Sequence, residues 1–320
     1  MSGWQRGILG IVLVAFAADR AAAWQAPKKS APAKAPPASA GSGAVLVIVN
    51  GEKITDADLN RSFAFLKVPE NERARVRRAF IDNLIDTRLI QQFLKSRKTV
   101  ATNQEVDEQI KLFKSGLKLA GLDPEKALHE NGFTTELLRE MIAVPLAWKH
   151  HIDRAVTPER LKEYFDEHRE QFDGTKLQAR QILIRANPGD EEARKAAEAR
   201  LNELRKQIVA KTISFEDAAR DHSEAPSKEQ GGDVGSFPYT GKMPVEFSRE
   251  AFKMKVGEIS QPFRSRFGVH LCLVTDRTPG DLSLEDVRDD VLARLSEELW
   301  KEMAAELRKT AKIEWKVEQP

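Results

Sequence analysis

The stretch "EQGGDVGSF", from Glu229 to Phe237, brings three glycines and Asp233 together in nine residues. Glycine-rich turns of this kind can cradle phosphate groups with backbone N–H donors. Here the G-x-x-x-x-G-K-[ST] arrangement is missing, and no lysine directly follows the last glycine. The stretch also follows a predicted helix and a polar loop instead of a strand. The sequence therefore disfavours phosphate binding and predicts a tight turn in which Asp233 accepts hydrogen bonds from loop amides.

Two other patterns give little reason to expect a metal site or a catalytic nucleophile. His150 and His151 are adjacent on a predicted helix, so their side chains point apart, and the sequence contains no H-E-x-x-H motif. Cys272 is the only cysteine, so it forms no internal disulfide. It lies in the apolar alternation "GVHLCLVTD", which predicts a small buried side chain and not a nucleophile.

The first residues have the three parts of a secretory signal: Arg6, an apolar run from Ile8 to Ala18, and a small-residue cleavage site at 21–23. The apolar run is shorter than the ~20 residues that a spanning helix needs. Export with cleavage is therefore the favoured interpretation, and an N-terminal membrane anchor is the alternative. The Ala-, Pro- and Lys-rich segment 24–43 is predicted to be a solvated linker.

Composition limits the class of protein. The chain has 320 residues, of which 41% are apolar and 31% are charged, which is typical of a folded protein with about two domains. The formal net charge of +2, spread along predicted helices, gives no electrostatic reason to expect a nucleic-acid partner.

Helical signals dominate the first half of the chain. The apolar run before Asn50-Gly51 predicts a strand that ends in a turn, and the chain from Thr55 to about Gln171 is predicted to be helical. Thr55 with Asp58 and Thr102 with Glu105 form predicted capping boxes. We expect Pro145 to kink or end its helix.

The pattern changes at Leu177. "LQARQILIRA" alternates like a strand, and two helices follow, the second opened by Ser214. After the glycine-rich stretch, the sequence predicts a short helix around "PVEFSREAF" and two strands, "GEISQPFRS" and "GVHLCLVTDR". This order predicts a compact α+β domain. After Gly280 a long helix carries its apolar residues on one face, so it must dock elsewhere, and the N-terminal helical region is the expected partner.

At this point the sequence resembles the parvulin (PpiC-like) family of peptidyl-prolyl cis-trans isomerases. Four landmarks of that family follow in register: "GGDVG", a segment with Met243 and Phe247, "GEIS", and "FGVH". The flanking parts look like the SurA/PrsA-type exported folding factors, and this resemblance implies export to the bacterial periplasm. The resemblance implies an α+β protein with an all-α N-terminal chaperone-like domain, completed by the C-terminal helix, and one parvulin domain with a four-stranded sheet and surrounding helices.

The resemblance also implies roles for individual residues. Met243, Phe247 and Val234 would line a proline pocket, with Phe237 beside it. His270 matches the histidine of the family's "FG-x-H" strand, and Ser265 matches a hydroxyl position of the same site. Rotation about a prolyl amide breaks no covalent bond, so no metal, cofactor or nucleophile is expected.

Two positions depart from the family pattern. Gln181 stands where the first strand usually carries a second histidine, and Ala225 stands where a Cys or Asp is common. Glutamine keeps a donor and an acceptor but does not titrate. We therefore expect weak isomerase activity that involves His270, Ser265 and Gln181, with unfolded exported polypeptides containing X-Pro bonds as substrates. The alternative is a barely catalytic or non-catalytic holdase chaperone that uses the parvulin domain for peptide binding.

The predicted domain organisation combines these expectations. It consists of a signal peptide at 1–23, the linker at 24–43, a helical chaperone-like domain at 44–172, a parvulin domain at 177–279, and a C-terminal helix with a short strand at 280–320 that packs on the N-terminal domain.

Overall fold

The computed structural model describes residues 43–130 and 132–317. The predicted signal peptide, the anchor that is its alternative, and nearly all of the linker lie outside the described residues. The described chain divides into two compact units: residues 43–161 with 292–317, and residues 162–291. Across the described residues, every helix is too short or too polar to cross a membrane.

The first unit begins with a hairpin. β1 (Val45–Val49) and β2 (Glu52–Thr55) pair in antiparallel fashion, and the turn residues Asn50 and Gly51 both have positive φ, as a two-residue hairpin turn requires. β7 (Ile313–Trp315) pairs with the other edge of β1, so the sheet order in the described part of the unit is β2-β1-β7. The helical region is therefore not all-α, because strands from the two ends of the chain pair with each other.

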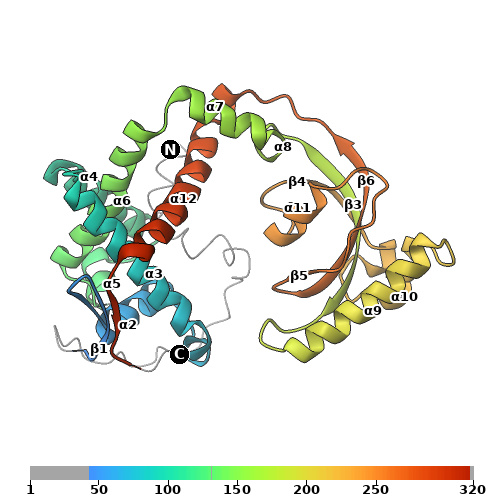
Figure 1. The fold of residues 1–320 in the computed structure, drawn as a ribbon, viewed down its shortest axis with the longest axis horizontal. Helices are drawn as coiled ribbons and strands as arrows, with labels where there is room; N and C mark the ends of the chain where they lie inside the picture. Colours follow the sequence, from blue (N-terminus) through green and yellow to red (C-terminus); the bar gives the residue numbers. More distant parts are fainter. Residues whose placement is uncertain (1–42, 131, 318–320) are drawn as a thin grey trace. The chain divides into compact units, whose positions relative to one another are not determined.

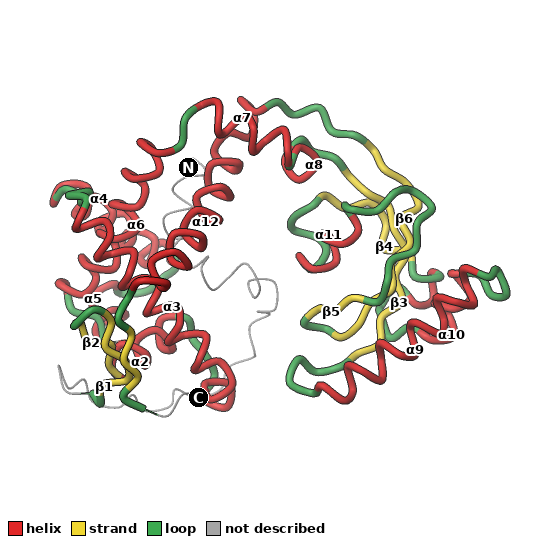
Figure 2. The backbone as a smooth tube through the Cα atoms, in the orientation of Figure 1, coloured by secondary structure: helices red, strands yellow, loops and turns green. Residues whose placement is uncertain are grey.

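Helices form the rest of the first unit (Figures 1 and 2). They are α2 (Asp56–Phe65), α3 (Glu70–Ser96), α4 (Asn103–Leu119), α5 (Pro124–Glu130), α6 (Thr135–Ala155), the start of α7 (Pro158–Glu167) and most of α12 (Leu284–Thr310). Both predicted capping boxes are present, at Thr55 and at Thr102. Pro145 does not end its helix, which was one of the two predicted outcomes, because α6 continues to Ala155 with buried residues on both sides of the proline.

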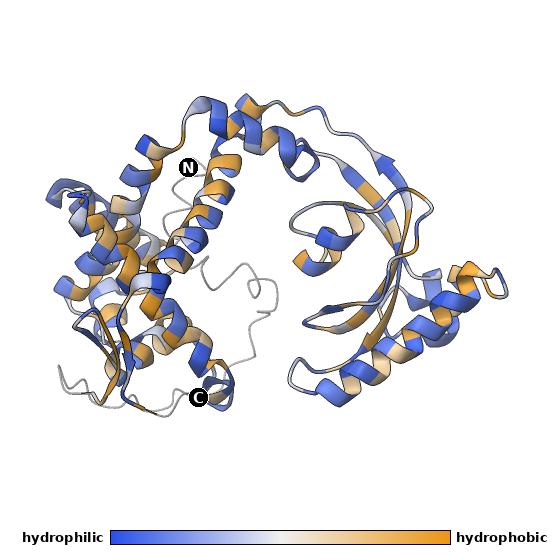
Figure 3. Cartoon of the chain, viewed as in Figure 1, coloured by the Kyte–Doolittle hydropathy of each residue, from blue (hydrophilic) through white to orange (hydrophobic). Residues whose placement is uncertain are grey.

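Helix α12 returns to the N-terminal helices. Hydrophobic and hydrophilic residues alternate along it (Figure 3), and Leu307, near its end, packs against the core of β1, α2 and α3. Trp148 of α6 donates a hydrogen bond from Nε1 to Ser296 Oγ of α12 at 3.0 Å. Arg308 of α12 pairs with Asp82 and Asp86 of α3. These contacts complete the helical region with the C-terminal helix, as the predicted fold class expects.

The second unit is a four-stranded antiparallel sheet with helices on both faces (Figure 1). In the described residues the strand order is β4-β3-β6-β5. The strands are β3 (Lys176–Arg185), β4 (Asp233–Pro238), β5 (Phe263–Ser265) and β6 (Gly268–Thr278), and the helices are α8 (Arg169–Phe172), α9 (Glu191–Val209), α10 (Phe215–His222), the 3-10 helix η2 (Lys228–Gln230) and α11 (Val245–Ala251). The predicted α+β class, with a four-stranded sheet and surrounding helices in this unit, is confirmed.

Two local expectations for this unit need correction. The glycine-rich stretch is not only a loop, because Asp233–Pro238 pairs with β3 as an edge strand. The expected strand "GEISQPFRS" is shorter than predicted: only Phe263–Ser265 is a strand, and Ile259 adds an isolated bridge to Leu273.

Candidate functional site

The alternation of side chains along β3 determines which face of the sheet carries the candidate site. Ile182 and Ile184 point to the core shared with α9 and α10, whereas Leu177 and Ala179 point to a second core that includes Phe247 of α11. Because side chains of a strand alternate between faces, Gln181 lies on the α11 face. Both faces of β3 are buried, and the polar Gln181 therefore needs an internal partner.

That partner is His270. The His270 Nδ1 atom lies 3.2 Å from Gln181 Oε1, and His270 Nε2 lies 2.6 Å from Ser265 Oγ. Phe267 donates its backbone N–H to the same Ser265 Oγ at 3.0 Å. Gln181, His270 and Ser265 thus form a polar chain: with Nδ1 donating to the amide oxygen and Nε2 accepting the serine proton, each imidazole nitrogen has one partner and the imidazole is neutral.

Burial keeps the imidazole neutral. Only 1% of His270 is exposed, and this desolvation lowers its pKa to about 4. Burial also raises the pKa of the nearby Cys272 thiol far above its usual range, and Cys272 is fully buried. The prediction that this cysteine is a small core residue is confirmed, and a thiolate nucleophile is excluded at this position.

Aromatic rings surround the imidazole. Phe263 stacks on His270 with ring centroids 5.4 Å apart, and Phe247 meets His270 edge-on at 5.7 Å. Phe237 contacts Phe247 in turn at 5.8 Å. Both Phe237 and Phe247 are fully buried, whereas Val234 and Met243 are half-buried against the same cluster. The structure thus brings all seven predicted site residues to one face of the sheet.

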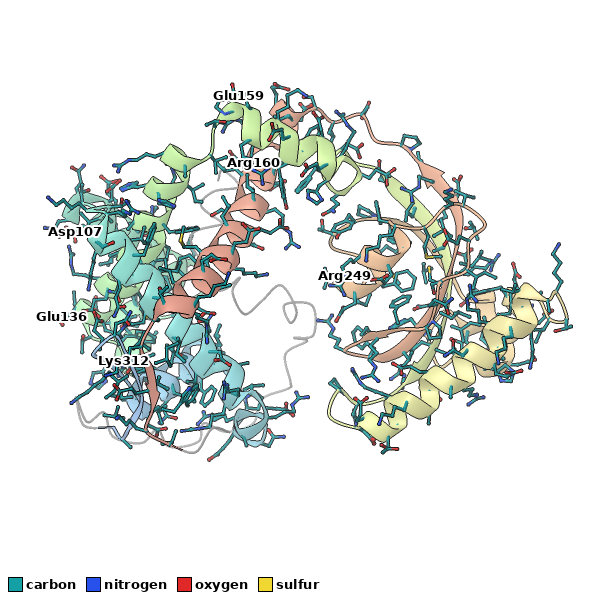
Figure 4. The ribbon with its side chains drawn as sticks, viewed as in Figure 1. Asp107, Glu136, Glu159, Arg160, Arg249 and Lys312 are labelled. Atoms are coloured by element: carbon teal, nitrogen blue, oxygen red, sulfur yellow. The ribbon has the colours of Figure 1, made fainter. Side chains whose placement is uncertain are left out.

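Helix α11 presents two different faces. Its residues Phe247, Ser248 and Ala251 are buried against the sheet. Arg249 is exposed and is labelled on α11 in Figure 4. The apolar face of this short helix therefore covers the polar chain.

The glycine-rich stretch approaches β3 closely. Gly231, Gly232 and Gly235 have positive φ. The Gly232 carbonyl accepts the Gln181 N–H at 2.8 Å, and a Cβ on Gly232 would lie 2.4 Å from the Gln181 carbonyl oxygen. Asp233 Oδ1 accepts the Gly235 N–H at 2.7 Å, which confirms the expected turn bond. Glycine is needed here so that the loop can pack against the backbone of the residue that holds His270.

Ala225 is a buried residue of the loop that follows α10. Ala225 is 5% exposed, and its N–H donates to Ser223 Oγ. The same hydroxyl accepts the N–H of Leu183, the strand partner of His270. The loop after α10 is thus attached to β3 by Ser223, and alanine adds no polar group.

Three residues that contact this region were not predicted from the sequence: Phe263, Ser223 and Lys242. Phe263 could have been found, because it lies two residues before Ser265 in a strand and must share its face. No sequence pattern indicated the roles of Ser223 and Lys242. Lys242 Nζ donates to the carbonyl oxygens of Val234 and Ser236 at 2.9 and 2.8 Å, which connects the Met243 loop to the edge strand.

Comparison with known proteins agrees with this geometry. A rotamase family model, described as the PPIC-type PPIase domain, matches residues 182–276. The fold and the sequence of the second unit are therefore those of a parvulin-type peptidyl-prolyl cis-trans isomerase.

Longer matches extend to the first unit. The foldase protein PrsA of Caldanaerobacter subterraneus is 30% identical over 250 residues, which cover 72% of each chain. The PrsA foldase of Geobacillus kaustophilus is 31% identical over 68% of this chain and 69% of its own length. The chaperone SurA of Albidiferax ferrireducens is 40% identical over 38% of this chain and 26% of its own length. The chain belongs to the PrsA family of foldases and is a peptidyl-prolyl isomerase.

Proposed function

We propose that this foldase is exported and accelerates folding by binding X-Pro segments on the α11 face of its parvulin unit. The observation that carries the proposal is the neutral hydrogen-bonded chain of Gln181, His270 and Ser265, buried beneath an aromatic cluster. Beside that cluster, Val234 and Met243 keep part of their apolar surface exposed. Partly exposed apolar side chains next to neutral hydrogen-bonding groups suit a proline ring and its amide.

Catalysis of this rotation depends on the shape of the binding site and on the exclusion of water from it. The barrier to rotation about a peptide bond is ~18–20 kcal/mol, because the planar amide is stabilised by resonance. An enzyme lowers this barrier by binding the twisted amide more tightly than either planar form. In this proposal Met243 and Val234 contact the proline ring, and Phe247 and Phe237 form the floor beneath them.

The hydrogen-bonded side chains of Gln181, His270 and Ser265 position the aromatic floor of the proposed pocket without adding a charge to it. A neutral His270, held by Gln181 and Ser265, fixes the planes of Phe263 and Phe247 through ring contacts. Gln181 replaces an ionisable partner, and Ala225 offers no side-chain donor. We therefore propose an activity that is present but modest.

Export and domain roles complete the proposal. The N-terminal signal pattern supports secretion to the periplasm, with a membrane anchor as the alternative outcome. We propose that residues 44–172, together with 280–320, hold unfolded chains, and that residues 177–279 isomerise prolyl bonds. The compact units divide elsewhere, after Leu161 and after Val291, so the later part of α7 and all of α8 belong to the parvulin unit by packing.

Proline-limited refolding of a model substrate tests the catalytic proposal. We expect the chain to accelerate refolding, and Met243→Ala to reduce kcat/KM by about tenfold, which corresponds to about 1.4 kcal/mol of lost contact. Arg249→Ala is the control, because Arg249 is exposed on α11. Equal activity of the two variants would refute the pocket. No acceleration by the wild-type chain, together with suppressed aggregation of an unfolded client, would favour the holdase alternative.

A further inference from the structure

Strand β5 brings two side chains to the imidazole of His270 although it is only three residues long. Phe263 lies opposite His270 in the pairing of β5 with β6, and its ring stacks on the imidazole. Ser265 Oγ lies 2.6 Å from His270 Nε2. Among the described residues β5 pairs only with β6, so it is an edge strand. Such a short strand makes few ladder hydrogen bonds, and contacts from outside the sheet are needed to fix its position.

These contacts come from α9, which covers the face of the sheet opposite α11 (Figure 1). Polar side chains that lie three, four and then seven residues apart follow one side of this helix, beside the buried residues Ala197 and Leu201. We refer to this row as the α9 clamp. It consists of Glu191, Arg194, Glu198 and Arg205.

Two arginines of the α9 clamp bind the backbone around β5. Arg194 Nη2 donates to the carbonyl oxygen of Ser265 at 2.8 Å, and Arg205 Nε donates to the carbonyl oxygen of Ser260 at 2.8 Å. Ser260 is itself bound to Cys272 of β6, through its backbone N–H and through its hydroxyl group. The α9 clamp therefore holds the chain both at the end of β5 and shortly before its start.

The side chain of Arg264, in the middle of β5, provides another attachment. Its guanidinium donates to Glu191 at 2.9 and 2.8 Å, and to Glu198 at 3.2 Å from Nη2. These hydrogen bonds lower the pKa of both carboxyl groups, so both are ionised at neutral pH. Because side chains alternate along a strand, holding Arg264 on the α9 face directs the residues on either side of it to the α11 face.

We propose that the α9 clamp positions the isomerase site. By holding β5 from the face opposite α11, it sets the contact of Ser265 with His270 and the plane of the Phe263 ring. Arg194 and Arg264 act through β5, so they are positioning residues and not catalytic ones. This inference rests on the proposed function for the catalytic use of the polar chain, whereas its geometric part is measurable without substrate.

Kinetics of arginine variants test the effect on the reaction. Arg194→Met removes the bond to the Ser265 carbonyl group, and Arg264→Met removes both carboxylate contacts. In the full chain each should lower kcat about tenfold for a short peptide with one Ala-Pro bond. KM should be nearly unchanged, because the proposed proline contacts, Val234 and Met243, lie on β4 and on the loop after it. Arg194→Lys, which keeps a donor at this position, should recover most of the lost kcat.

Two matched controls make the same kind of change away from the α9 clamp. Lys195→Met is the next residue of α9, and its exposed side chain pairs with Glu192. Arg220→Met removes an exposed arginine of α10 that pairs with Asp217. Both should keep the wild-type kcat. Thermal unfolding identifies which variants are folded at the assay temperature, and Glu198→Gln replaces either arginine variant that is not.

The imidazole provides a readout that is independent of turnover. In the isotope-labelled full chain, the NMR resonance of His270 Nε2 reports whether Ser265 donates to it. Arg194→Met and Arg264→Met should shift this resonance, and Lys195→Met should leave it unchanged. An unshifted resonance in the folded arginine variants would overturn the positioning role, whatever their activity.

The two measurements separate this inference from the proposed function. A shifted resonance together with a lowered kcat supports both. A shifted resonance with unchanged kcat supports the α9 clamp and refutes the catalytic use of the polar chain. If the wild-type chain does not isomerise the peptide, the proposed function fails, while the resonance of His270 still decides whether the α9 clamp holds Ser265 in place.

Discussion

His270 Nδ1 lies 3.2 Å from Gln181 Oε1, so a non-titrating amide holds the buried imidazole whose other nitrogen meets Ser265. An amide accepts the imidazole N–H without creating a charge, and burial then lowers the pKa of His270 to about 4. The site is therefore neutral over the physiological pH range.

The first prediction concerns pH. His270 stays neutral in the folded chain between pH 8 and about pH 5, so isomerase activity should be flat over that range, without a step near 6.5. The unfolded chain has an ordinary histidine, which binds a proton below about pH 6.5. Because the folded pKa is the lower one, the stabilisation is complete above pH 6.5 and is lost as the pH falls towards 4.

Urea unfolding measures that loss. His270 should contribute about 2 kcal/mol less to the free energy of unfolding at pH 5 than at pH 7. A Gln181→Glu variant places a carboxylate beside Nδ1, which should raise the pKa of His270 and introduce a step in the pH–rate profile. A step near pH 6.5 in the wild-type profile would show that the imidazole is exposed to water during the reaction.

The second prediction concerns Phe247. Its side chain is fully buried and contacts Phe237, Phe263 and His270. Phe247→Ala should therefore destabilise the parvulin unit by roughly 3–5 kcal/mol as well as abolish isomerase activity. Thermal unfolding and refolding assays of the same preparation measure both effects.

Phe247→Leu separates the two effects, because leucine leaves a smaller cavity. It should keep the unit folded at 25 °C while lowering activity by roughly tenfold, and Arg249→Ala should change neither quantity. Undiminished activity in folded Phe247→Leu would mean that this ring supports the fold alone.

The third prediction concerns Gly232. An alanine Cβ would lie 2.4 Å from the Gln181 carbonyl oxygen, and the φ of +82° is unfavourable for alanine. Gly232→Ala should lower the free energy of unfolding by more than about 2 kcal/mol and displace Gln181 from His270. The matched control is Gly189→Ala, where a Cβ meets nothing within 4 Å. Similar stability of the two variants, by urea titration, would contradict the close approach.

The fourth prediction concerns Lys242, which we assign as a positioning residue. Its Nζ donates to two carbonyl groups of β4, so Lys242→Met should release the Met243 loop from the edge strand. We expect KM to rise about threefold with kcat nearly unchanged, because in the proposed site this loop contacts substrate, whereas the buried chain of Gln181, His270 and Ser265 is left unaltered. Lys253→Met removes an exposed surface pair with Glu250 and serves as the control. A fall in kcat at constant KM would refute the positioning role.

The local parts of this protein were predictable from the sequence. Capping boxes at Thr55 and Thr102 depend on side chains three residues apart, and the burial of Cys272 follows from alternation within one strand. The order of the parvulin landmarks was likewise a property of the linear chain. It indicated the fold and seven candidate site residues without any knowledge of their contacts.

Long-range relationships were decided by the tertiary structure. Gln181 and His270 are 89 positions apart, and only the pairing of β3 with β6 brings them together and removes them from water. The pKa of His270 follows from that burial. The pairing of β1 with β7 and the continuation of α6 through Pro145 also depend on packing between distant segments. Sequence patterns report what neighbouring residues favour, whereas these features arise from free energy gained when separate surfaces are buried together.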